Sequence, residues 1–235
     1  MQTPPPSPAL ERALAGLRPI RTRRPARVLV GVAVASLAYA AVFVWKLGAR
    51  SDLARLPLIP FALYAAASLA TFLALLWCAL IPPRGQVLPS GTTSARVAAL
   101  MLGALVGLDL AIAAHPLAGG QLQAASLAAA LAAAGRCLAT SMGVVAVPVA
   151  LGLWSLRRLL FGNGWRVRVA LGGAAGALGG LVLHVHCAAP DAAHVGLVHG
   201  AALLLPAALL GVTAIGRLSS QADQDMSDEV ARHGT

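Results

Sequence analysis

Histidine and cysteine, the side chains best suited to metal or redox chemistry, are concentrated near the end of this sequence. Four of the six histidines and one of the three cysteines lie between His184 and His199. Imidazole and thiolate suit zinc or copper, and two cysteines on one oxidising face could equally form a reversible disulfide. On a helix, His184 and Cys187 would share a face, whereas His186 would be rotated away from His184. The spacing predicts a metal or redox site. Which other residues join it depends on how the secondary-structure elements are arranged.

The composition places those elements in a bilayer. The chain of 235 residues is 58% hydrophobic and 11% charged, and its mean hydropathy of +0.78 is not that of a water-soluble protein. Three cysteines are too few for a disulfide framework, and no cleavable signal pattern opens the chain, so residues 1–27 are expected to remain attached. The net charge of +10 could suggest nucleic acid. Because the arginines fall in loops between apolar segments, membrane topology explains them better, and no direct nucleic-acid binding is expected.

We predict an all-α fold, an integral membrane bundle of six transmembrane helices whose partner is the lipid bilayer. The transmembrane domain covers 28–218. It follows an arm at 1–27 and precedes an acidic tail at 219–235 that is expected to be disordered. The predicted spans are 28–47, 57–81, 97–114, 138–156, 169–187 and 194–218.

The fourth and fifth spans carry two special features. The apolar segment 124–154 is long for one span and too short for two spans with a turn. We therefore assign 121–134 to an alanine-rich helix on or near the outer surface, and we expect Pro148 to kink the fourth span. In the fifth span a glycine at every fourth position predicts close contact with a neighbouring helix. These glycines are Gly172, Gly176 and Gly180.

Basic residues are divided unequally between the two sides of this bundle. Six spans place both termini on one side, which then holds 14 of the 18 lysine and arginine residues. By the positive-inside rule both termini are cytoplasmic, and the loops after the first, third and fifth spans face outward.

This topology gathers the candidate metal ligands for a zinc or copper ion at the outer face. Arg136 would favour the thiolate of its neighbour Cys137. Simpler roles remain open, because Asp191 could cap the sixth span, and His184 and Cys187 could be packed and inert. His199 is expected to lie deeper than the other histidines and to face elsewhere than His194. The candidate ligands are His115, Cys137, His184, His186, Cys187 and His194.

Asp109 is the only acidic residue inside a predicted span. A carboxylate is costly in hydrocarbon, so Asp109 should face the bundle interior as a functional or packing residue. The sequence has no phosphate loop, nucleophile elbow or His-Glu-x-x-His motif, so catalysis is not expected.

The arm contains one short amphipathic segment. Ser7 can cap a helix and Pro8 fits its first turn, while Leu10, Leu14 and Leu17 form one apolar stripe. So short a helix is not stable alone in water, so it either rests on the membrane interface or becomes ordered on a partner.

With these residues in place, the chain resembles the NrsF-like family of six-span bacterial membrane anti-sigma factors. The resemblance is carried by Gly135-Arg136-Cys137-Leu138, by Pro148 with the segment 151–158, and by the glycine-rich span ending in His186-Cys187. It continues through Asp191, His194 and His199, and at the other end through the arm segments 10–14 and 18–21. The chain departs from the family pattern at Ala188, where proline is common, and lacks the usual tryptophan in 195–199.

The resemblance implies a multi-pass protein of the bacterial inner membrane whose arm holds an extracytoplasmic-function sigma factor. It implies Cys137 and Cys187 as the sensor pair for metal or oxidant stress. It also assigns sigma binding to the arm, where we place it on Leu10, Leu14, Leu17 and Arg18. The alternative function is a small metal or solute transporter using the same ligands. A transport path needs polar residues in several spans, and apart from Asp109 the mid-membrane positions are apolar or small.

Overall fold

The computed structural model of the chain describes residues 25–51, 53, 58–81, 91–113, 127–158, 165–187 and 194–213. They form six helices joined by connections that lie largely outside the described residues. The last helix, Val195–Thr213, begins with a π-helical turn, η3 (Val195–His199). The others are α2 (Pro25–Leu47), α3 (Leu58–Leu80), α4 (Gly91–Ala113), α5 (Leu127–Arg158) and α6 (Trp165–His186).

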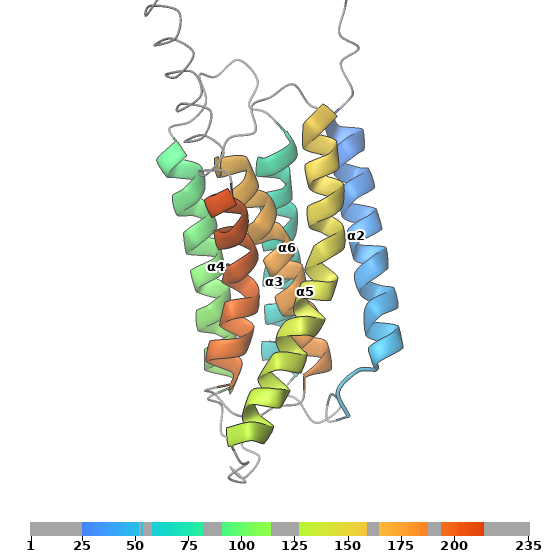
Figure 1. The fold of residues 1–235 in the computed structure, drawn as a ribbon, viewed down its shortest axis with the longest axis vertical. Coiled ribbons are helices and arrows are strands. Elements are labelled where there is room, and N and C mark those ends of the chain that lie inside the picture. The colour runs from blue at the N-terminus through green and yellow to red at the C-terminus, as the bar shows by residue number, and fades with distance from the viewer. Residues whose placement is uncertain are drawn as a thin grey trace, which may run out of the picture.

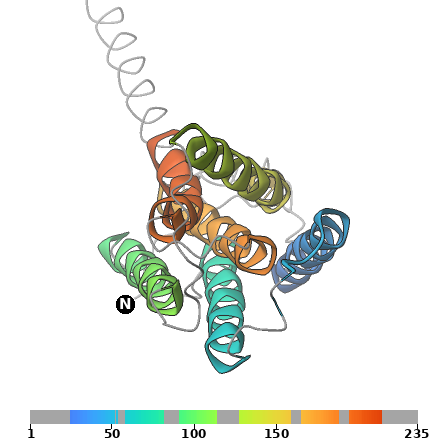
Figure 2. The ribbon, with the colours of Figure 1, turned by 90° about the horizontal axis from the view of Figure 1, so that it is seen from below.

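The helices run alternately up and down in one bundle (Figure 1). Seen along the bundle, α6 lies in the middle and the other five surround it (Figure 2). Five of the described helices, all but α4, are long and apolar enough to cross a membrane, which indicates a membrane protein. α4 lies alongside them in the same bundle, and its crossing as a sixth span stays a prediction.

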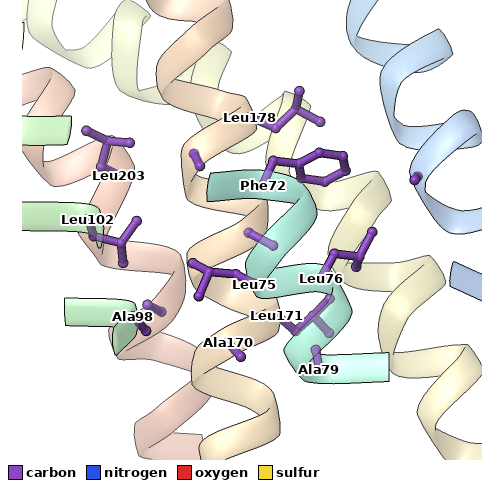
Figure 3. Packing of buried hydrophobic residues seen from close by; sticks show 14 of the residues in the cluster. Phe72, Leu75, Leu76, Ala79, Ala98, Leu102, Ala170, Leu171, Leu178 and Leu203 are labelled. Atoms are coloured by element: carbon purple, nitrogen blue, oxygen red, sulfur yellow. The ribbon is translucent and has the colours of Figure 1, made fainter. Parts of the chain in front are cut away.

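Small side chains fill the centre of the bundle and large apolar ones cover its outside. From Ala170 to Gly180 every residue of α6 is buried, and Leu171 and Leu178 are the only ones larger than alanine. Leu75 of α3 and Leu102 of α4 reach the space beside Gly173 of α6 (Figure 3). On the outside, large apolar side chains such as Trp45, Leu58 and Leu100 are exposed. This distribution suits packing in lipid, where helices associate through close contact rather than through hydrophobic burial.

The predicted glycine stripe of α6 lies against the last helix. A Cβ atom at Gly172 would meet the backbone carbonyl of Pro206, and one at Gly176 would meet the backbone carbonyl of Leu203. At Gly180 it would meet the Cδ2 atom of Leu203 at 2.7 Å. At Gly172 and Gly176 the two backbones approach more closely than a side chain on α6 would allow, and at Gly180 the Leu203 side chain occupies the space.

The separate surface helix predicted at 121–134 is wrong within the described residues. From Leu127 onward this segment belongs to α5, which continues without interruption for 32 residues. Alanine is the strongest helix former, and the one poor helix former between 127 and 138, Gly135, costs only about 1 kcal/mol, which the surrounding alanines tolerate. At about 1.5 Å per residue α5 is about 48 Å long. It therefore extends well beyond a hydrocarbon core of about 30 Å.

Pro148 lies inside α5 and the helix continues through it. Figure 1 shows α5 changing direction along its length, as expected where proline removes one helical hydrogen bond. The hydroxyl of Tyr39 in α2 donates to the Gly143 carbonyl at 3.1 Å. This carbonyl adjoins that of Val144, which Pro148 leaves without its helical donor. A neighbouring helix thus supplies hydrogen bonding next to the interruption.

Besides α5, three helices begin before the predicted spans. α2 begins at Pro25, α4 at Gly91 and α6 at Trp165, whereas the spans were predicted to begin at 28, 97 and 169. The hydropathy pattern locates the apolar part of a helix, and polar residues can continue its hydrogen bonding beyond the hydrocarbon. The arm up to residue 24, the tail 219–235, His115 and Asp191 lie outside the described residues.

Candidate functional site

Two cysteines and one histidine from three elements meet at one end of the bundle. The Sγ atoms of Cys137 in α5 and Cys187 after α6 lie 3.4 Å apart. The Nε2 atom of His194, at the start of the last helix, lies 3.6 Å from the Cys187 Sγ. The ligand atoms of these three residues all lie within 4.8 Å of one another. We call Cys137, Cys187 and His194 the thiol site.

The local backbone explains how Cys187 reaches this position. Its N–H donates to the Leu183 carbonyl at 2.7 Å, so it continues the hydrogen bonding of α6 by one residue. Cys187 is buried and Cys137 is partly exposed, so the pair is open to solvent from the Cys137 side.

The spacing of the thiol site fits a tetrahedral metal ion. With Zn–S bonds of about 2.3 Å and Zn–N bonds of about 2.0 Å, a tetrahedral ion places two sulfurs about 3.8 Å apart and a sulfur and a nitrogen about 3.5 Å apart. The 3.6 Å between the Cys187 sulfur and His194 Nε2 is close to this geometry, and the two sulfurs, 3.4 Å apart, would separate slightly around an ion. Both cysteines are in the thiol form, and two thiols this close can also be oxidised to a disulfide. The site can therefore bind a metal ion or undergo redox chemistry.

A second polar cluster lies beside the thiol site, deeper in the bundle. The carboxylate of Asp109 in α4 contacts His184 in α6 through Oδ1, 3.2 Å from Nδ1. Its Oδ2 lies 3.1 Å from the Nδ1 atom of His199 in the last helix. Asp109 is 3% exposed, His184 4% and His199 2%, so this buried triad joins three helices with almost no access to solvent. Asp109 lies in the bundle interior, as predicted. Its two side-chain partners are histidines.

The two histidines of the buried triad have different surroundings. The His184 ring stacks on Phe61 at 5.0 Å between centroids and contacts Tyr64 at 4.2 Å. The His199 ring instead packs edge-on against His194 of the thiol site, at 5.8 Å between centroids.

The expectation that His199 faces elsewhere than His194 is wrong. In an α-helix, residues five apart are separated by about 140° around the axis. Residues 195–199 form a π-helical turn, which hydrogen-bonds five residues apart and so brings positions five apart together. Such turns occur frequently at functional sites. His199 is therefore deep, as predicted, but lies next to the thiol site.

The structure separates the other predicted ligands from the thiol site. His184 belongs to the buried triad. The Nδ1–H group of His186 donates to the Gly48 carbonyl at 2.8 Å, because a carbonyl oxygen only accepts. Gly48 ends α2 with a φ of 83°, a left-handed conformation suited to glycine. His186 thus ties the end of α6 to the connection after α2. His115 lies outside the described residues.

Sequence reasoning missed the pairing of Asp109 with His184 and His199, and the aromatic rings around His184. His199 and Asp109 are 90 residues apart, and nothing in their local sequence indicates that they pair. A buried carboxylate in a chain with few other polar residues was the available signal, since it must find donors inside the bundle.

Comparison with known proteins identifies the family of this chain. The profile of the NrsF family, described as negative regulator of sigma F, matches residues 14–219. The chain belongs to the NrsF family. The resemblance found in the sequence is thereby confirmed, and the description names a regulator of a sigma factor rather than an enzyme or a transporter. The matched region includes every described residue, and with them both the thiol site and the buried triad of this NrsF protein. No curated protein and no solved structure matches the chain.

Proposed function

We propose that this NrsF protein is a membrane-bound anti-sigma factor that sequesters an extracytoplasmic-function sigma factor and releases it on an envelope signal. The carrying observation is the close approach of Cys137 and Cys187, 3.4 Å between sulfurs, in a helical bundle of this family. Metal binding or oxidation at these sulfurs would tie α5 to α6. Because the two helices pack along the bundle, a change at one end can be transmitted to the other.

The arrangement of the helices supports different roles for the two ends of the bundle. α2 begins and the last helix ends at one end of the bundle, and the thiol site lies at the other (Figure 1). The arm and the tail continue from the first end. With 14 of the 18 basic residues on the side of the termini, the positive-inside rule favours a cytoplasmic arm and an outward thiol site in the bacterial inner membrane.

Reporter fusions at Gln2 and Gly234 test this orientation. We expect both to report the cytoplasm, because basic loops are retained on that side. A fusion at Gly48, which ends α2 near the thiol site, is the matched control and should report the outer side. A reporter at Gln2 or Gly234 that is active outside would overturn the orientation and the sensing role of the thiol site.

The arm is the segment that we assign to sigma binding. Leu10, Leu14 and Leu17 form its apolar stripe, and Arg18 lies beside them. An amphipathic segment too short to be stable alone gains order when its apolar face enters a groove on a partner. Its arginines would meet acidic groups at the rim, where charges contribute less than buried anchors do.

A sigma-dependent reporter in cells tests the sensing role. Replacing both Cys137 and Cys187 by serine should fix the reporter in one state, because serine removes the soft ligand and the redox chemistry alike. Reporter output would be measured under cadmium, copper and peroxide. Cys78→Ser is the matched control, since Cys78 is exposed on α3 outside the thiol site, and it should respond as the native protein does.

The same reporter separates sensing from binding. Leu14→Asp should release the sigma factor without any signal, since truncating a buried anchor typically costs at least about 1 kcal/mol and a buried charge more. Membrane levels are measured alongside. If the double cysteine variant responds like the native protein, the cysteines are not the sensor. If Leu14→Asp represses normally, the arm does not hold the sigma factor.

A further inference from the structure

The Nε2 atom of His199 is a buried polar atom without a hydrogen-bond partner among the described residues. Its ring is 2% exposed, so solvent does not supply one. An ionised carboxylate only accepts, so the Nδ1 atom facing Asp109 carries the hydrogen. In the neutral ring Nε2 is then a bare lone pair, on the side of the imidazole away from Asp109. A buried lone pair of this kind is costly unless something binds it.

The pairing of His199 with Asp109 is the arrangement that metal-binding histidines commonly have. A ligating imidazole usually donates its other ring N–H to a carboxylate, which fixes the tautomer and makes the free nitrogen a stronger ligand. Asp109 makes this contact at 3.1 Å. His199 is thus oriented for binding through Nε2.

The thiol site lies beside the His199 ring. The His199 ring packs edge-on against His194, whose Nε2 atom lies 3.6 Å from the Cys187 sulfur. Three ligand atoms already lie within 4.8 Å of one another, and a closed tetrahedral site needs a fourth. Two thiolates also neutralise a divalent cation, so an ion held there would add no net charge to a poorly solvated region.

We propose that His199 is the fourth ligand of a tetrahedral site for a zinc-class divalent ion, completed by Cys137, Cys187 and His194 and oriented by Asp109. The inference rests on the proposed function only in using the same thiol site. It adds His199 to that site as a ligand and Asp109 as a positioning residue. Since His199 contacts Asp109 of α4, an ion bound there would connect α4 to α5, α6 and the last helix.

His184 provides an internal control for this assignment. Like His199 it contacts Asp109 through Nδ1 and has an Nε2 atom without a hydrogen-bond partner among the described residues. Its ring, however, lies against Phe61 and Tyr64 instead of the thiols. His184 therefore shares the carboxylate and the burial but should not bind the ion.

The test is titration of the full-length reduced protein, purified in detergent, with Co²⁺ and then with Zn²⁺ in competition. Native protein should show thiolate-to-cobalt charge transfer and the intense d–d bands of tetrahedral cobalt, both removed by Zn²⁺. His199→Gln should weaken Zn²⁺ binding by at least about 10-fold and reduce the d–d bands. Asp109→Asn should keep the tetrahedral spectrum but bind about 10- to 100-fold more weakly. His184→Gln removes a contact to Asp109 but no ligand, so it should keep the full tetrahedral d–d bands and lose less affinity than His199→Gln.

Each variant is checked for folding by its elution profile and thermal unfolding. Should His199→Gln fail to fold, His199→Cys replaces it, and its charge-transfer band should rise by about half because three thiolates bind instead of two. Native-like cobalt spectra and affinity in folded His199→Gln, or in His199→Cys, overturn the assignment, as does absence of cobalt binding to the native protein. The sigma-dependent reporter measures release of the sigma factor and does not measure metal binding. If the cobalt titration overturns the metal site, the reporter still tests the proposed function.

Discussion

Gly176→Leu is expected to prevent the last helix from packing on α6. A Cβ atom at Gly176 would already meet the Leu203 carbonyl, and it would lie 3.0 Å from the carbonyl carbon of Leu203. Backbone atoms cannot turn aside as a flexible side chain can, so the two helices must separate. Overpacking in a core typically costs about 1 to 3 kcal/mol, and a leucine against backbone lies at or above the top of that range.

Thermal unfolding of the purified protein in detergent measures this loss. Gly107→Leu in α4 is the matched control, because a Cβ at Gly107 meets nothing within 4 Å and the position is exposed. That variant should be as stable as the native protein, or more stable by up to about 1 kcal/mol, since glycine is a poor helix former. Equal stability of the two leucine variants would mean that the last helix does not lie on the glycine stripe.

Asp109→Ala is expected to produce the second largest loss of stability. It leaves the Nδ1 atoms of His184 and His199, both buried, without their acceptor. An unsatisfied buried group costs about 1 to 3 kcal/mol, so two of them predict a loss of about 3 kcal/mol or more. Three helices meet at this carboxylate, and the free energy of unfolding of the whole bundle should fall with it.

The measurement is again thermal unfolding, with a chelator present so that no bound metal contributes. Ser36→Ala is the control, because Ser36 is also fully buried in the bundle but its Oγ has no hydrogen-bond partner among the described residues. Removing that hydroxyl should be close to neutral. An Asp109→Ala protein as stable as Ser36→Ala would show that the buried triad does not hold the helices together.

The sequence predicted the helical architecture and the convergence of Cys137 with the end of the fifth span, because both follow from apolar segments and their alternating direction. It did not predict that Leu127–Arg158 is one helix, since hydropathy cannot tell a helix that leaves the membrane from one that ends there. It also missed the proximity of His199 to His194, because the prediction assumed α-helical periodicity where the chain forms a π turn. The partners of Asp109 depend on how three helices are aligned along their axes, and local sequence does not fix that alignment.

The glycine stripe also limits how α6 and the last helix can move past each other. The backbone of Leu203 lies against Gly176 and its side chain against Gly180, so this leucine occupies the hollows that two missing side chains leave. The hollows recur every four residues, about 6 Å along the helix. Intermediate alignments take Leu203 out of its hollow, so the favoured positions are separated by a whole repeat. A shift along this interface would therefore occur in discrete steps, as one-turn shifts between packed helices do. The response of the interface to a stimulus would then be all-or-none rather than graded.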